Sequence, residues 1–244
     1  MRLEIVALSD LPEVRRGDDL AALIRDAAKK ERQPIDRSVI LAVAQKIVSK
    51  AEGAIADLRE IQPSAFAQSW AGQWGKDARL IELILSQSRR ILKMDRGVLI
   101  TETRLGHVCA NAGVDQSNVE GDDFATILPA DPDASAARLR KELGCGAVII
   151  TDTFGRPWRE GLVDVAIGVA GFAPLEDYRG CVDRRGRKLT GTIVAVADQL
   201  AAAAGILMRK AEGYPVVLLR GFEWKAAEAS ARALIRSPEQ DLFR

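Results

Sequence analysis

The run Val39-Ile40-Leu41-Ala42-Val43-Ala44 decides the fold class, because six consecutive apolar residues are typical of a strand buried on both faces. Residues 147–150 and 216–220 repeat this pattern. Polar stretches follow the first two runs at once, at 45–53 and 151–159. Ligands often gather where the chain leaves a buried strand, so the sequence predicts a central sheet with a site at its strand ends.

Outside these runs, helices and strands intermix without regular alternation. Residues 122–135 and 177–191 are expected to be turn-rich connections, the second as an exposed hairpin or loop. Strands are expected at 3–8, 98–101 and 163–169, and helices after Asp18 as N-cap and at 77–93, 136–143, 198–210 and 223–235. Neither a dinucleotide-binding glycine fingerprint nor a P-loop motif is present. The sequence therefore predicts an α+β fold with mixed sheets, not a Rossmann or P-loop fold.

The composition describes a nearly neutral chain. Its 244 residues include 35 Lys and Arg against 34 Asp and Glu, which gives a formal net charge of +1. We therefore expect no nucleic-acid partner and no membrane surface, and any phosphate recognition must be local. Cys109, Cys145 and Cys181 are dispersed, without the spacing of a zinc site or a disulfide framework. No apolar run reaches membrane-spanning length, and a cytoplasmic location is predicted.

The segment 106–118 concentrates glycines, asparagines, one aspartate and the only histidine of the chain. A second polar segment, 151–159, contains Asp152 and Thr153, and we expect the two segments to be loops that together form an active site. Two carboxylates such as Asp115 and Asp152 could hold a divalent cation together with phosphate oxygens. Either aspartate alone is explained equally well as an Asx turn or a helix cap. We expect His107 and Cys109 to be structural, because a single histidine more often makes a structural hydrogen bond and nothing near the cysteine lowers its pKa.

Lysines and arginines near these segments have two interpretations each. Lys46 and Lys50 could neutralise phosphate charge, or could form a solvated helix end with Glu52 as salt-bridge partner. Arg156 and Arg159 flank Trp158 and could hold a carboxylate or a phosphate, or could simply cover apolar surface.

Taken in order, these segments resemble the coenzyme F420-0:L-glutamate ligase family from about residue 3 to Arg220. The resemblance is carried by Leu11-Pro12-Glu13-Val14 with Gly17-Asp18-Asp19-Leu20, by 45–53, by 110–118, by Asp152-Thr153-Phe154-Gly155-Arg156-Pro157-Trp158-Arg159, and by Val194-Ala195-Val196-Ala197-Asp198. Long glycine-punctuated motifs in the right order are far more specific than any one motif alone.

The resemblance implies a GTP-dependent amide ligase that adds L-glutamate to F420-0, and further γ-linked glutamates to F420-glutamate, releasing GDP and phosphate. It implies Mg²⁺ or Mn²⁺ and a family-specific two-domain fold in an intertwined homodimer. It places the metal on Asp115, Asp152, Thr153 and Glu212, with Asp115, Asp152 and Lys50 as catalytic residues. It places the nucleotide on Leu11, Pro12, Glu13, Val14, Gln45, Lys46, Lys50, Asn118, Glu212 and Gly213.

The family resemblance leaves two other functions open. A ligase of the same fold could act on another carboxylated acceptor, because a fold and a metal site do not define the acceptor pocket. The chain could also be a GTP-binding protein without turnover. We expect residues 1–244 to form one ligase module of two interleaved subdomains, without the nitroreductase-like domain that follows it in some bacterial relatives.

Overall fold

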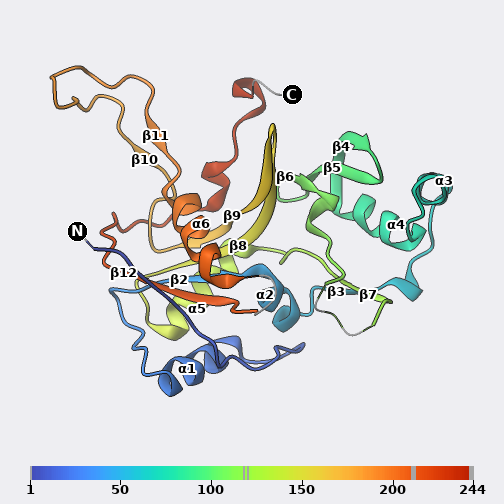
Figure 1. Cartoon of the computed structure of the whole chain (residues 1–244), viewed down its shortest axis with the longest axis horizontal. Helices are drawn as coiled ribbons and strands as arrows, with labels where there is room; N and C mark the ends of the chain where they lie inside the picture. Colours follow the sequence, from blue (N-terminus) through green and yellow to red (C-terminus); the bar gives the residue numbers. More distant parts are fainter. Residues whose placement is uncertain (1, 118, 120, 210–212, 242–244) are drawn as a thin grey trace.

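A five-stranded mixed sheet forms the centre of the computed structural model (Figure 1), which describes residues 2–117, 119, 121–209 and 213–241. The parallel pair β2–β8 lies inside this sheet, and its other neighbours pair antiparallel. The strand order is β1 (Glu4–Ala7), β12 (Val216–Arg220), β2 (Ile40–Ala44), β8 (Ala147–Arg156) and β9 (Arg159–Ala170). The predicted buried runs are therefore β2, β8 and β12.

Helices cover both faces of this sheet (Figure 1). Along β2, Leu41 and Val43 face one core and Ile40 and Ala42 the other, as the alternation of a strand requires. One face carries α1 (Leu20–Lys30), α2 (Gln45–Glu52) and α5 (Pro132–Leu143), and the other carries α6 (Val196–Met208). We call the sheet with these four helices the sheet body.

A second region, made of the described residues between 54 and 127, lies beside the sheet body at the right of Figure 1. It has hydrophobic clusters of its own, built around Leu99 and Leu58. It contains the pair β3 (Ile55–Asp57) and β7 (Phe124–Thr126), helices α3 (Ala65–Trp74) and α4 (Ala78–Gln87), and the sheet β4 (Ser88–Asp95), β5 (Val98–Thr103) and β6 (Val108–Ala110). The prediction of an α+β fold with mixed sheets is confirmed.

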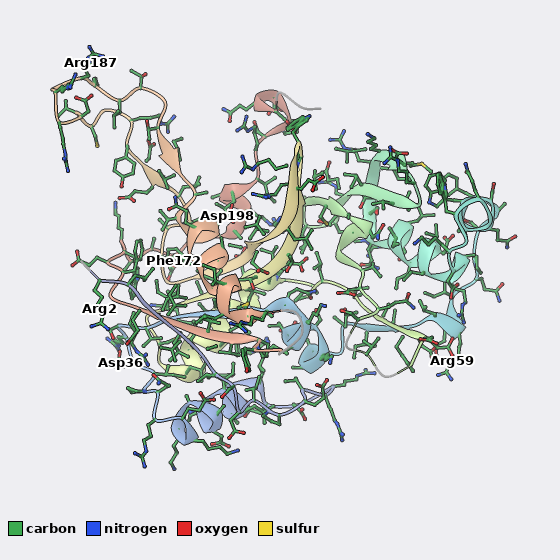
Figure 2. The ribbon with its side chains drawn as sticks, viewed as in Figure 1. Arg2, Asp36, Arg59, Phe172, Arg187 and Asp198 are labelled. Carbon is green, nitrogen blue, oxygen red and sulfur yellow. The ribbon has the colours of Figure 1, made fainter. Side chains whose placement is uncertain are left out.

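A polar arm extends from the sheet body, as predicted for residues 177–191. Strands β10 (Glu176–Asp177) and β11 (Ile193–Val194) form its base, and Arg187 lies near its tip (Figure 2). Every helix among the described residues is too short or too polar to cross a bilayer.

Four predicted element boundaries are wrong. Asp19, not Asp18, caps α1, because its carboxylate accepts from the Ala22 amide at 2.9 Å. The helix expected at 77–93 ends at Gln87, since the following residues pair with β5. Residues 122–135 are not all irregular: they contain β7, and α5 begins at Pro132.

The fourth correction concerns the tail, which is not the predicted helix at 223–235. It contains only a short 3-10 helix, Ala231–Leu234, within that range. Phe222, Trp224 and Leu234 pack against the core on the α6 face, and this packing outweighs local helix propensity.

Candidate functional site

The site begins at one edge of the sheet, where β2 ends beside β8. The two strands are parallel and Ala44 lies opposite Thr151, so α2 begins beside the part of β8 that starts at Asp152 and extends beyond β2. The Ala44 amide donates to the Pro215 carbonyl at 2.8 Å, which brings the start of β12 to the same place. Ligands of open α/β sheets bind at the carboxyl ends of parallel strands, and this edge has that geometry.

A cleft of 440 Å³ opens at this edge, and we call it the strand-edge cleft. It gathers most of the segments that the sequence analysis selected from distant parts of the chain. Its lining residues are Leu11, Pro12, Glu13, Val14, Ala44, Gln45, Lys46, Ile47, Lys50, Ser117, Thr151, Asp152, Thr153, Asp164, Met208, Arg209, Gly213, Tyr214 and Pro215.

Helix α2 points its N-terminus into the cleft. Its N-cap is Ala44, which offers no side-chain hydrogen bond to the first-turn amides. Uncapped amides at a helix N-terminus suit phosphate oxygens. Lys46 and Lys50 lie one turn apart and so share a face of this helix. The buried Gln45 lies within hydrogen-bond distance of the Ser49 hydroxyl, with 2.8 Å between Oε1 and Oγ, which fixes its side chain against the helix.

Lys50 pairs with Glu13 from the segment before α1. The Lys50 side chain is only 9% exposed, whereas Glu13 is 69% exposed and lies at the cleft rim. The alternative prediction, that Glu52 is the salt-bridge partner of these lysines, is wrong. The Glu52 carboxylate accepts from Ser135 and pairs with Arg138 of α5. The lysine is therefore directed at the cleft and not at a solvated helix end.

Asp115 reaches the site from the second region. Its backbone exchanges two hydrogen bonds with Thr126, at 3.0 and 2.8 Å, so a short bridge to a buried residue holds it. The preceding 3-10 turn, Asn111–Gly113, places Asn111 and Ala112 at positive φ of 54° and 53°. Such conformations are uncommon outside glycine and persist only where surrounding contacts enforce them.

The Asp115 carboxylate is held by three bonds. Ser117 donates its amide at 2.7 Å and its hydroxyl at 3.0 Å, and Lys46 Nζ lies 2.6 Å from Oδ2. Burial alone would raise the pKa of Asp115, but the bonds from Lys46 and Ser117 and the lysine charge outweigh it and lower the pKa. Asp115 is therefore ionised, and Lys46 and Ser117 stand between it and the cleft.

Asp152 and Thr153 lie on β8 and not in a loop, which corrects the expectation of a second loop. Asp152 Oδ1 accepts from the Thr153 amide at 2.8 Å. The Thr153 hydroxyl donates to Asp164 Oδ1 at 2.6 Å, because the two residues face each other across β8 and β9.

The oxygen donors at this edge fit a hard divalent cation. Asp152 and Thr153 line the cleft and supply a carboxylate and a hydroxyl, and Asp115 supplies a second carboxylate beside Lys46. These are ligand types that Mg²⁺ and Mn²⁺ take, and no histidine or cysteine is among the residues that line the described cleft. Within the described residues no three histidine, cysteine or carboxylate side chains converge, so substrate phosphate and water would complete the coordination.

Two predicted site residues, Asn118 and Glu212, lie outside the described residues. Arg156 and Arg159 do not join the cleft: they lie at the tip of the β8–β9 hairpin, where Arg156 donates to the carbonyls of Glu160 and Gly161. Trp158 between them is 81% exposed. The structure thus gives these arginines no place beside Asp152.

His107 and Cys109 are structural, as expected. Burial raises the pKa of the Cys109 thiol to about 12, so it is not a thiolate nucleophile. Burial also lowers the pKa of His107, whose ring meets Phe154 edge-on with centroids 6.1 Å apart. The histidine thereby joins the second region to β8.

Sequence reasoning missed Asp164 and gave no role to Ser117. Asp164 carries a visible signal, because it is the only charged residue among the apolar residues 162–167 of a strand. Ser117 carried a weaker one, as the residue two positions after a loop aspartate that can close an Asx turn on its amide.

Comparison with known proteins gives a consistent result. A family model described as F420-0:gamma-glutamyl ligase matches residues 9–221. The chain is 45% identical over 252 residues to a protein of Methanothermobacter thermautotrophicus named coenzyme F420:L-glutamate ligase, and the match covers 100% of both chains. A protein of the same name from Methanopyrus kandleri is 47% identical over 254 residues, with 100% of this chain and 98% of the relative covered.

Proposed function

The chain belongs to the F420-0:gamma-glutamyl ligase family and is a ligase, and we propose that it joins L-glutamate to coenzyme F420-0 in the strand-edge cleft at the expense of GTP. One observation carries this proposal. Lys46, Lys50, Asp152 and Thr153 come from the two family segments 45–53 and 152–159 and converge in one cleft. The shared name of the relatives alone would not require these residues to converge.

The reaction must activate a carboxylate, because a carboxylate and an amine do not condense in water. In the proposed first step, a carboxylate oxygen of F420-0 attacks the γ-phosphorus of GTP, the bond to GDP breaks, and an acyl phosphate forms. The amine of L-glutamate then attacks the acyl carbon, the bond to phosphate breaks, and the amine proton leaves with phosphate. Further γ-linked glutamates would be added by repeating these steps on F420-glutamate.

The residues of the cleft suit phosphoryl transfer, which depends chiefly on positioning and on charge neutralisation. Lys46, Lys50 and the first-turn amides of α2 would hold the phosphates, and Leu11 to Val14 with Gly213 would line the nucleotide. Asp115, Asp152 and Thr153 would hold Mg²⁺ or Mn²⁺, with Asn118 and Glu212 as further contacts that the family motif places there. Bound there, the cation would neutralise charge on the phosphate oxygens.

Lys46 has two competing anions in this scheme. Its Nζ lies 2.6 Å from Asp115 Oδ2 and also donates to the Ser117 hydroxyl. We propose that Lys46 exchanges Asp115 for phosphate when GTP binds, which frees the carboxylate to ligate. The Lys46 and Asp115 side chains are only partly exposed, at 27% and 36%. Lys46 would therefore neutralise the Asp115 carboxylate until GTP and the cation bind.

We also propose a cytoplasmic homodimer in which the sheet body and the second region are the two subdomains. Exposed apolar side chains at the β8–β9 hairpin support an interface, namely Trp158 at 81% and Leu162 at 67% exposure. Sedimentation analysis of the full chain tests the dimer, and a monomer at all concentrations would refute it.

One assay tests the function. Purified protein is incubated with F420-0, L-glutamate, GTP and Mg²⁺ or Mn²⁺, and GDP release is followed together with the mass of the product. We expect stoichiometric GDP and glutamylated F420. GDP release only with another acceptor would point to a different substrate, and GTP binding without release to a protein without turnover. Replacing GTP by ATP tests nucleotide preference, and equal rates would refute GTP dependence.

A further inference from the structure

We propose that Asp164 is a positioning residue of this ligase site, which orients the Thr153 hydroxyl toward a bound divalent cation, and that Gly205 of α6 is the glycine that makes room for it. This inference rests on the proposed function, because it assumes that Thr153 ligates the cation. Nothing in the family resemblance gave Asp164 a role.

Asp164 has an unusual place in its strand. It lies in an apolar stretch of β9 and directly faces Thr153 of β8. A half-buried carboxylate is costly unless it is paired, and the bond that holds Oδ1 comes from a neutral threonine hydroxyl at 2.6 Å. A threonine or valine would serve the strand better, so packing does not account for the carboxylate.

The bond to Asp164 fixes the direction of the Thr153 hydroxyl. A threonine hydroxyl has one proton and two lone pairs. With the proton on the Asp164 side, the oxygen can meet any other partner only as an acceptor or as a ligand. Both residues line the strand-edge cleft, next to Asp152. The charge of Asp164 also makes the hydroxyl oxygen a better cation ligand, as carboxylates behind ligating side chains do.

Helix α6 also accommodates the Asp164 carboxylate, independently of the hydrogen bond to Thr153. Gly205 lies in the last turns of α6, in a helix otherwise rich in alanine. A Cβ at this position would lie 2.1 Å from Asp164 Oδ2 and 2.9 Å from its Cγ. Alanine is the better helix former, yet it does not fit unless the carboxylate moves. The helix therefore accommodates Asp164 at the position that Thr153 requires.

The test measures Mn²⁺ binding by electron paramagnetic resonance of the free ion on wild type and six variants. GTP is present, with a protein-free GTP blank, and F420-0 and L-glutamate are left out so that no turnover occurs. Asp164→Ala should weaken Mn²⁺ binding by about 10- to 100-fold, the usual effect of losing a residue behind a metal ligand. Asp164→Asn should weaken it less, because its amide oxygen still accepts the Thr153 bond. Gly205→Ala should weaken it by displacing the carboxylate.

A double-mutant cycle separates positioning from general instability. Thr153→Val removes the hydroxyl and keeps the shape of the side chain, and we expect Thr153→Val with Asp164→Ala to bind Mn²⁺ no more weakly than Thr153→Val alone. Asp198→Asn is the matched control, since Asp198 also accepts from β9, at the Ala166 amide, but is not among the residues that line the cleft. It should leave Mn²⁺ binding unchanged.

Two results would overturn the inference alone: Mn²⁺ affinity of Asp164→Ala within twofold of wild type, or additive losses in the cycle. A lower melting temperature of Asp164→Ala with unchanged Mn²⁺ affinity would likewise mean that Asp164 has only a structural role. Wild type that binds no Mn²⁺ would overturn the proposed metal-dependent function and this inference with it, so the two failures are distinguishable.

Discussion

The sheet body and the second region contribute to the site in different ways. The body supplies Lys46, Lys50, Asp152 and Thr153 from a helix and a strand that are anchored in the large core. The second region, with its smaller clusters, supplies Asp115, which follows a strained turn. The two meet through the Lys46–Asp115 ion pair, the 2.7 Å bond from Ser49 to the Ile127 carbonyl and the ring contact of His107 with Phe154. The body thus fixes the geometry of the site, and the second region completes the site. We call the set of contacts between the two regions the seam.

The largest effect should come from removing either aspartate. Asp152→Asn in the body and Asp115→Asn in the second region should each lower kcat by at least about 10²- to 10³-fold, because charge stabilisation of this kind is usually the largest catalytic contribution. Circular dichroism should show that both variants stay folded. Asp177→Asn on the exposed arm is the control and should be fully active.

The two aspartate variants also test whether both regions contribute to the site. Near-normal activity of Asp115→Asn would confine the site to the sheet body. Near-normal activity of Asp152→Asn would refute the metal assignment altogether.

Core truncation should distinguish the two regions. Leu41→Ala and Leu99→Ala each remove a fully buried side chain and should lower the free energy of unfolding by about 2–5 kcal/mol. We expect Leu99→Ala to speed amide exchange in the second region while β2 stays protected, whereas Leu41→Ala should affect both regions. Uniform loss of protection in both variants would mean that the molecule unfolds as one unit.

Lys46→Met should weaken the seam without disturbing either core. Losing a charged hydrogen bond of about 1.5–3 kcal/mol should raise the apparent KM for GTP roughly ten- to a hundredfold. The pKa of Asp115 should rise, because the lysine is its main lowering partner, and ¹³C NMR of the carboxyl can follow this. Lys141→Met at the exposed end of α5 should change neither quantity; an unchanged KM in Lys46→Met would refute the exchange of anions.

The smallest effect concerns His107 on the seam. Burial depresses its folded pKa below the ordinary value of 6.5, so the unfolded chain binds the proton more readily. Its contribution to stability is therefore complete above pH 6.5 and is lost as the pH falls through the folded pKa. His107→Gln should reduce the difference in unfolding free energy between pH 7 and pH 5, because the glutamine does not titrate. An unchanged difference would contradict the burial of the neutral ring.

Some elements of the fold could be predicted from the sequence and others could not. Strands β2, β8 and β12 were predictable because long apolar runs suit only a buried sheet. The helix at 77–93 was overextended because the helical periodicity of apolar residues continues past Gln87, and only pairing with β5 ends it. The local sequence pattern thus predicts an element where its own apolar residues determine its structure. It fails where pairing with a distant segment determines where the element ends.

The same distinction holds in the site. Lys46 and Asp152 could be expected together, because each follows a buried run and parallel strands end at one edge. The residues alone did not place Asp115 beside Lys46, since that contact depends on how the second region packs and on the bridge to Thr126. Only the family resemblance predicted a shared role. Asp164 was missed because its partner Thr153 lies across a hairpin.

Amide hydrogen exchange on the full chain tests the central claim most directly. Addition of GTP with Mg²⁺ should slow exchange at the first turn of α2 in the body and at Asp115 to Ser117 in the second region, in the same titration. Slowing in only one of the two regions, or at neither, would contradict a site that is completed across the seam.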